Sequence, residues 1–99
     1  MTNVGIFGAN GRMGRNLIEA VVADETATLS ACSVRESSPF DKMDAGLIAG
    51  IGATNIYASS ELESLAPLTN VWIDFTLPEA LSANIDFCVN HKINMVIGV

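Results

Sequence analysis

The stretch Val4-Gly5-Ile6-Phe7-Gly8-Ala9-Asn10-Gly11-Arg12-Met13-Gly14 decides the fold of this 99-residue chain. Residues 4–7 form a short apolar run that is typical of a strand, and residues 12–23 place apolar side chains at helical spacing. Three glycines, spaced three residues apart, lie between the two. The sequence therefore predicts a strand, a glycine turn and a helix, which is where a dinucleotide pyrophosphate sits on a helix N-terminus.

The glycine turn differs from two common phosphate-binding motifs. Its spacing is not G-x-G-x-x-G, and no Lys-Ser or Lys-Thr follows it as in a P-loop, which disfavours an ATPase. Glycine permits positive φ and lets a phosphate approach the backbone, whereas a side chain at Gly14 would push the helix off the strand. The alternative is a turn that only joins a strand to a helix, but its position and spacing favour a nucleotide site.

Strand-like and helical stretches alternate along the rest of the chain. Besides residues 4–7, we expect strands at residues 28–34, 56–58, 71–75 and 94–99. Such alternation implies right-handed crossovers and a parallel sheet. We therefore predict one α/β domain over residues 1–99, a Rossmann-like open parallel sheet with helices on both faces that stops after its fifth strand. The pattern assigns no secondary structure to residues 42–53.

Two capping motifs are expected to begin the later helices. Ser60 and Glu63 have the spacing of a capping box for a brief helix that closes near residue 67. Thr76 is expected to cap a second helix, with Glu79 answering it, and this helix runs to about Asn90.

Composition narrows the class of protein. The formal net charge of -6 argues against a nucleic-acid surface, because such affinity comes mostly from basic groups. Cys32 and Cys88 lack disulfide-dense or metal-ligand spacing and are expected to be inert thiols in a reducing compartment. The start of the chain lacks the pattern of a signal peptide. We expect a cytoplasmic protein without a metal, membrane or nucleic-acid partner.

The end of the second predicted strand bears on cofactor choice. In dinucleotide-binding folds an acidic residue there holds the ribose hydroxyls, and an arginine accepts a 2′-phosphate. Arg35, followed by Ser37 and Ser38, offers a guanidinium and two hydroxyls, which favours NADPH over NADH. Glu36 keeps the choice open because it could turn toward the ribose, and Arg35 could instead be a solvated loop charge.

A second motif closes the fourth predicted strand, on the same edge of the sheet as the glycine turn. It reads Ile73-Asp74-Phe75-Thr76-Leu77-Pro78-Glu79, and by itself it is explained equally well by helix capping. The glycine turn, this motif and Met95-Val96-Ile97-Gly98, taken together and in this order, closely resemble the 4-hydroxy-tetrahydrodipicolinate (dihydrodipicolinate) reductase family. The resemblance covers the whole chain, but only the N-terminal, nucleotide-binding portion of that family.

The resemblance implies an enzyme of diaminopimelate and lysine biosynthesis that reduces a cyclic imine dicarboxylate by hydride transfer from NADPH or NADH. It also implies a set of cofactor contacts: the pyrophosphate and adenosine side at Gly8, Ala9, Asn10, Gly11, Arg12 and Met13; the 2′-phosphate at Arg35; and the nicotinamide at Phe75, Thr76 and Gly98.

The resemblance implies a second domain that binds the substrate carboxylates, carries the lysine that donates the proton and forms the tetramer. We therefore expect no catalytic residue in this chain, and no activity from it alone. His91 is expected to lie at a helix C-terminus and to be a capping or surface residue.

Two departures from the family pattern bear on these expectations. Val34 stands where many relatives carry the ribose-binding acid, which favours NADPH, and Val99 stands where the family typically continues with threonines that contact the nicotinamide. Two alternative functions remain: a non-catalytic NAD(P)H-binding module, and the N-terminal half of a short-chain dehydrogenase or epimerase-like protein.

Overall fold

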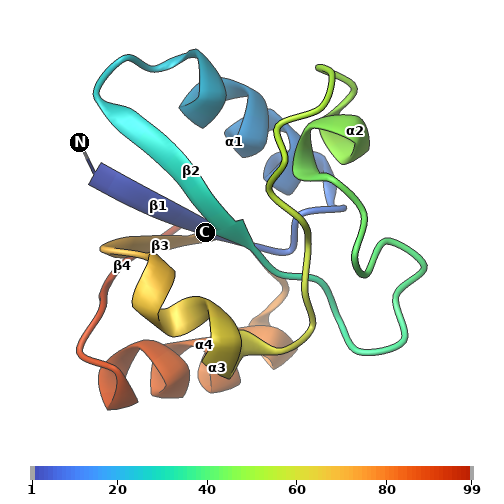
Figure 1. Cartoon of the computed structure of the whole chain (residues 1–99). Coiled ribbons are helices and arrows are strands. Elements are labelled where there is room, and N and C mark those ends of the chain that lie inside the picture. The colour runs from blue at the N-terminus through green and yellow to red at the C-terminus, as the bar shows by residue number, and fades with distance from the viewer. Residues whose placement is uncertain (1, 99) are drawn as a thin grey trace.

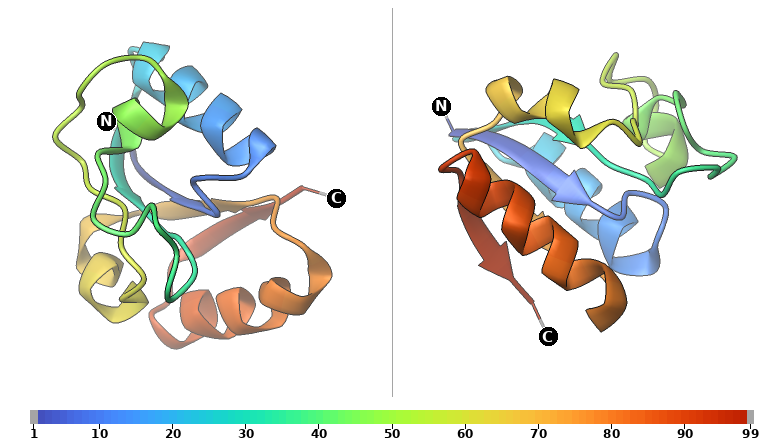
Figure 2. Two further views of the ribbon diagram at one scale, coloured as in Figure 1. Left: turned by 90° about the vertical axis from the view of Figure 1, so that its right-hand side faces the viewer. Right: turned by 90° about the horizontal axis from the view of Figure 1, so that it is seen from below.

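A computed structural model describes residues 2–98 of the chain. Its elements are β1 (Thr2–Phe7), α1 (Arg12–Ala23), β2 (Ala27–Cys32), α2 (Ala45–Ala49), α3 (Leu62–Leu65), the 3-10 turn η1 (Ala66–Leu68), β3 (Val71–Asp74), α4 (Pro78–Asn90) and β4 (Asn94–Ile97). The strands form one parallel sheet in the order β2-β1-β3-β4. Helices α1 and α2 cover one face and α3 and α4 the other (Figure 1), which gives three layers (Figure 2). The predicted Rossmann-like fold is confirmed.

The alternation of side chains along β1 supplies two separate cores. Val4 and Ile6 are buried on one face of the sheet against Ile18 of α1, and Phe7 is buried on the other. On that second face Phe7 stacks on Trp72, with ring centroids 4.3 Å apart, and Phe87 meets both rings edge-on. Aromatic pairs in these geometries add about 0.5–1.5 kcal/mol each to the stabilisation from burial.

The predicted strand at residues 56–58 is wrong. Tyr57 makes only an isolated antiparallel bridge with Asp44, and the described sheet has four strands. The backbone of this segment pairs instead with the preceding loop, because Ala45 N–H donates to Ile56 and Ala58 N–H donates to Met43. With these hydrogen bonds made locally, the segment cannot extend the sheet, and β4 becomes the last strand described.

Residues 45–49, to which the sequence pattern assigned no secondary structure, form α2. Asp44 is its N-cap: the carboxylate accepts hydrogen bonds from Gly46 N–H at 2.7 Å and Leu47 N–H at 3.4 Å. The same side chain also accepts from the backbone N–H groups of Thr54 and Asn55. One buried carboxylate therefore starts the helix and anchors the loop that returns beside it.

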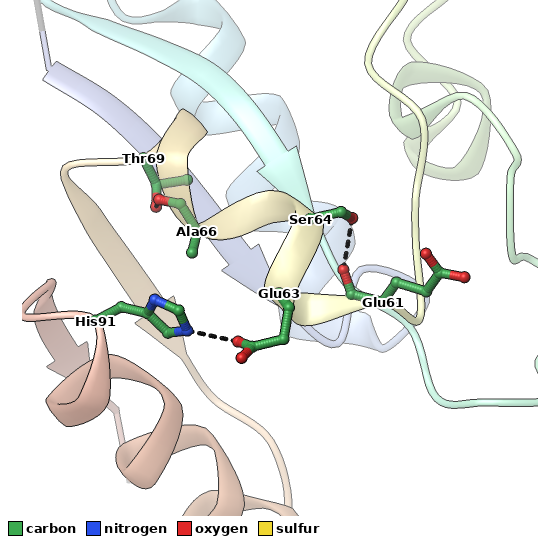
Figure 3. A network of polar contacts seen from close by, with 6 residues as sticks. All are labelled: Glu61, Glu63, Ser64, Ala66, Thr69 and His91. Atoms are coloured by element: carbon green, nitrogen blue, oxygen red, sulfur yellow. Dashed lines mark hydrogen bonds and ion pairs between the residues drawn. The ribbon is translucent and has the colours of Figure 1, made fainter.

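The expected capping box of Ser60 and Glu63 is also wrong. The helix begins one residue later than expected, at Leu62, without a side-chain cap, and Ser60 bonds to Asp41 instead. Glu63 pairs with His91 at the C-terminal cap of α4, so that this contact ties α3 to α4 (Figure 3). His91 therefore lies at the helix end, as predicted.

Candidate cofactor-binding site

A cleft of about 640 Å³ opens at the carboxyl ends of β1 and β3. From β1 the chain crosses to β2 on one side, whereas β3 lies on the other side of β1. The cleft therefore occupies the topological switch point of the sheet, where open α/β folds bind their ligands. Its walls come from the glycine turn, from Val34 and Arg35 after β2, and from the turn between β3 and α4.

The glycine turn is built by close backbone approach. Gly8 has a φ of +71°, which disfavours other residues, and a Cβ on Gly14 would lie 2.0 Å from the Gly8 carbonyl oxygen. Helix α1 can therefore start this close to β1 only with glycine at residue 14. Gly11 is different: a Cβ there would lie 3.5 Å from the same oxygen, an ordinary contact. The fold itself does not require glycine at residue 11.

The N-terminus of α1 presents unpaired backbone donors to the cleft. Gly11 is the N-cap and supplies no side-chain cap, and the first N–H group of the helix with an acceptor is that of Arg15. Within residues 2–98, the N–H groups of Arg12, Met13 and Gly14 have no protein acceptor, and all three residues line the cleft. Such donors, together with the helix dipole, favour an anion.

A smaller cavity of about 250 Å³ adjoins the cleft. It is lined by residues 35–39 and by Asn10, and Asn10 and Arg35 also line the main cleft. Arg35, an exposed residue, therefore lies where the two cavities meet, and Ser37 and Ser38 line the smaller one.

The turn after β3 is held by a buried carboxylate rather than by glycine. Asp74 accepts hydrogen bonds from the Thr76 N–H group at 2.7 Å, the Thr76 hydroxyl at 2.5 Å and Asn84 Nδ2 at 2.8 Å. The prediction that Thr76 caps α4 and Glu79 answers it is therefore wrong, because the N-cap is Leu77, which has no side-chain cap bond. Thr76 instead lines the cleft.

The structure brings most of the predicted cofactor-binding residues together. The residues from the predicted set that line the cleft are Gly8, Asn10, Gly11, Arg12, Met13, Arg35, Phe75 and Thr76. Ala9 is fully buried and its N–H group donates to Ser33, so it lies outside the lining. Gly98 lies beneath the Phe75 ring, where a Cβ would come within 1.8 Å of Phe75 Cε1.

Sequence reasoning missed two cleft residues of note, Leu77 and Asn84. Leu77 lies within the second motif and lines the cleft with an apolar side chain that is 69% exposed; its place in that motif was the signal that could have found it. Asn84 gave no such signal, since a polar residue within a helix is ordinarily solvated.

The two cysteines are buried in the two cores. Burial, with a smaller contribution from Asp44, raises the pKa of the Cys32 thiol to about 12, and burial also raises the pKa of Cys88. Both are therefore protonated and weakly nucleophilic near neutral pH.

Among residues 2–98, no group of three His, Cys, Asp or Glu side chains is placed to hold a metal ion. None of the described helices has both the length and the apolar character needed to cross a membrane.

The family model described as dihydrodipicolinate reductase, N-terminus, matches residues 2–99. The chain belongs to the dihydrodipicolinate reductase family. The 4-hydroxy-tetrahydrodipicolinate reductase of Pseudoalteromonas atlantica is 47% identical over 98 residues, which cover 99% of this chain and 37% of that protein. The corresponding protein of Psychrobacter arcticus is 41% identical over 98 residues, covering 99% and 35%. The chain thus spans little more than a third of these relatives, and the match favours this family over the short-chain dehydrogenase alternative.

Solved structures show the same fold. A dipicolinate-bound dihydrodipicolinate reductase from Paenisporosarcina sp. TG-14 has a TM-score of 0.76 at 23% identity, covering 100% of this chain and 37% of its own. Aspartate semialdehyde dehydrogenase with NADP from Candida albicans has a TM-score of 0.80 at 15% identity, covering 100% and 30%. At these identities the likeness establishes the fold alone.

Proposed function

We propose that this chain is the cofactor-binding part of a reductase that converts 4-hydroxy-tetrahydrodipicolinate to tetrahydrodipicolinate in lysine and diaminopimelate biosynthesis, and that it uses NADPH in preference to NADH. Family membership and the 41–47% identity to proteins of that name support the reaction. The observation that carries the cofactor assignment is the set of unpaired N–H groups at the α1 N-terminus, which line a cleft at the switch point of the sheet.

The proposed cofactor lies across the edge of the sheet. Its pyrophosphate is held by the free N–H groups of α1, with the glycine turn, residues 8–13, around it. Its nicotinamide end borders Phe75, Thr76 and Gly98, where the Phe75 ring is 38% exposed and offers an apolar surface. The cofactor supplies the hydride, and the residues of this chain bind and orient it.

The preference for NADPH rests on the smaller cavity. Arg35, Ser37 and Ser38 line it, and it shares Asn10 and Arg35 with the cleft. A guanidinium and two hydroxyls suit a 2′-phosphate, because charge-assisted hydrogen bonds to phosphate are strong and directional. Glu36 also lines this cavity, and its negative charge opposes the binding of an anion. The preference for a 2′-phosphate therefore depends on the guanidinium of Arg35.

The test is calorimetric titration of the protein and of Arg35→Ala with NADPH and with NADH. We expect Arg35→Ala to lose about tenfold to a hundredfold in NADPH affinity, since a charge-assisted hydrogen bond contributes about 1.5–3 kcal/mol, while NADH affinity stays unchanged. Arg15→Ala removes the same charge outside both cavities and is the matched control. Unchanged NADPH affinity in Arg35→Ala would contradict the assignment.

We further propose that residues 1–99 alone bind NADPH weakly and do not reduce the substrate. The resemblance assigns the proton donor and the substrate-binding groups to the portion of the relatives that this chain does not span. Absorbance at the NADPH band, followed with dihydrodipicolinate present, measures this directly. Turnover by residues 1–99 would contradict the proposal that the proton donor and the substrate-binding groups lie outside this chain.

A further inference from the structure

Asp74 is a fully buried carboxylate at the edge of the cleft, although it does not line the cleft itself. A buried carboxylate is costly unless its oxygens accept hydrogen bonds. Here Oδ1 accepts from the N–H and hydroxyl groups of Thr76, and Oδ2 accepts from Nδ2 of Asn84. Both residues that donate to Asp74 line the cleft, so the carboxylate acts on the cleft through them.

The hydrogen bonds of Asp74 determine what Thr76 can offer a ligand. A threonine hydroxyl has one proton to donate and two lone pairs that accept. The proton of Thr76 goes to Asp74 Oδ1, and Asn84 Nδ2 donates to one lone pair of Thr76 Oγ1 at 3.4 Å. The Thr76 oxygen therefore has no proton left to donate, and its second lone pair is the hydrogen-bonding capacity that this cleft-lining hydroxyl retains for a ligand.

The turn that carries Thr76 is also fixed on its other sides. The Gly98 N–H group donates to the Asp74 carbonyl at 2.8 Å, which joins the end of β4 to the turn. The Phe75 ring packs on Gly98, and the Thr76 methyl group faces Gly8, where an added Cβ would lie 2.9 Å from it. A hydroxyl held in this way is oriented before a ligand arrives.

We propose that Asp74 and Asn84 are positioning residues that make Thr76 a fixed, acceptor-only group, so that the cleft selects a ligand with an N–H donor at that point. This inference rests on the proposed function, under which the donor is the carboxamide NH₂ of the nicotinamide. A ligand that carries a methyl group in place of that NH₂ leaves the Thr76 lone pair without a partner and binds less tightly.

The test compares the affinity for NADPH with that for its 3-acetylpyridine analogue, in which a methyl group replaces the amide NH₂. We expect the protein to bind NADPH about tenfold more tightly than the analogue, the effect of one hydrogen bond. Thr76→Val should bind both alike, and Thr76→Ser should restore the difference. Asn84→Ala should reduce the ratio, because Asp74 loses the donor that orients it. Asn90→Ala, an exposed asparagine on the same helix, is the control.

The ratio of the two affinities separates positioning from a merely structural role, since general loosening weakens both ligands together. A tenfold preference that persists in Thr76→Val or in Asn84→Ala overturns the proposal. Equal affinities in the unaltered protein overturn it as well, while leaving NADPH binding intact. Failure of the unaltered protein to bind NADPH at all would instead refute the proposed function together with this inference.

Discussion

Helices α1 and α2 lie on the same face of the sheet, yet the first N–H groups of α2 have hydrogen-bond acceptors and those of α1 do not. In α2 each of the first four N–H groups, from Ala45 to Ile48, has an acceptor, supplied by the Asp44 side chain, the Asp44 carbonyl and Ile56. In α1 the first three N–H groups have no acceptor among the described residues, and its N-cap is the bare Gly11. A closed N-terminus stabilises a loop, whereas an open one at a cleft is available to an anionic ligand.

Gly14→Ala should have the largest effect on this comparison, because it attacks the place where α1 meets β1. Alanine favours a helix interior by about 1 kcal/mol over glycine, but a Cβ 2.0 Å from the Gly8 carbonyl cannot be accommodated without moving the helix. Overpacking of this kind costs about 3 kcal/mol. Urea unfolding should show the loss of stability, and NADPH binding should disappear with it. Stability equal to that of the unaltered protein would contradict the close approach.

Asp44→Ala should open the N-terminus of α2 and leave that of α1 untouched. The carboxylate serves both the helix and the loop at Thr54 and Asn55, so its loss should cost about 2–3 kcal/mol in the free energy of unfolding. NADPH affinity should stay within twofold, since Asp44 does not line the cleft. A large fall in affinity with intact folding would show that α2 and the cleft are coupled.

The pH dependence of stability offers an independent check on Asp44. Burial by itself raises the pKa of this carboxyl, but hydrogen bonds from Thr54, Asn55 and Gly46 outweigh burial and leave the pKa below its ordinary value. Its contribution is therefore complete above the unfolded-state pKa of about 3.9 and is lost as the pH falls through the lower, folded-state pKa. The difference in unfolding free energy between the protein and Asp44→Ala should be largest above about pH 5 and should shrink toward pH 3.

Gly11→Ala should have the smallest effect on folding and a selective effect on binding. The Cβ would meet only an ordinary contact at 3.5 Å, and the φ of −75° at Gly11 suits alanine, so stability should change by less than about 1 kcal/mol. Gly11 lines the cleft as the N-cap of α1, so an added methyl group should reduce the room for the pyrophosphate, and NADPH affinity should fall about tenfold, an effect of about 1.4 kcal/mol. Unchanged affinity would place the pyrophosphate elsewhere. The contrast with Gly14→Ala, the same substitution three residues away, separates a glycine needed by the fold from one needed by a ligand.

Local signals in the sequence were enough for the elements that define the fold. The apolar run of β1, the helical spacing of α1 and the Pro78 start of α4 follow from short-range pattern and backbone chemistry, and the predicted helix at residues 12–23 is confirmed at both ends. The order of the motifs also identified the family, which the match to residues 2–99 bears out. Assignments to the cofactor, such as that of Arg35, remain predictions.

The errors share one physical cause, which is competition between the expected hydrogen-bond partner and another partner that the fold brings within reach. Thr76 and Ser60 each have the local spacing of a helix cap, yet their hydroxyls bond to Asp74 and Asp41. The apolar residues 56–58 are suited to a strand, but their backbone is already paired with the loop before α2. A local pattern states what a residue can do and does not say which partner is nearest after folding.

The sequence by itself determined the class of fold, the glycine turn and the family, because strand and helix periodicity and glycine chemistry act within a few residues. Only the tertiary structure decided which N–H groups stay open, which carboxylate closes α2 and how the Thr76 hydroxyl is oriented. Those outcomes depend on which donors lie within reach of Asp44 and Asp74 once the chain is folded, among them Thr54 and Asn84, because buried carboxylate oxygens must find hydrogen-bond donors within the protein.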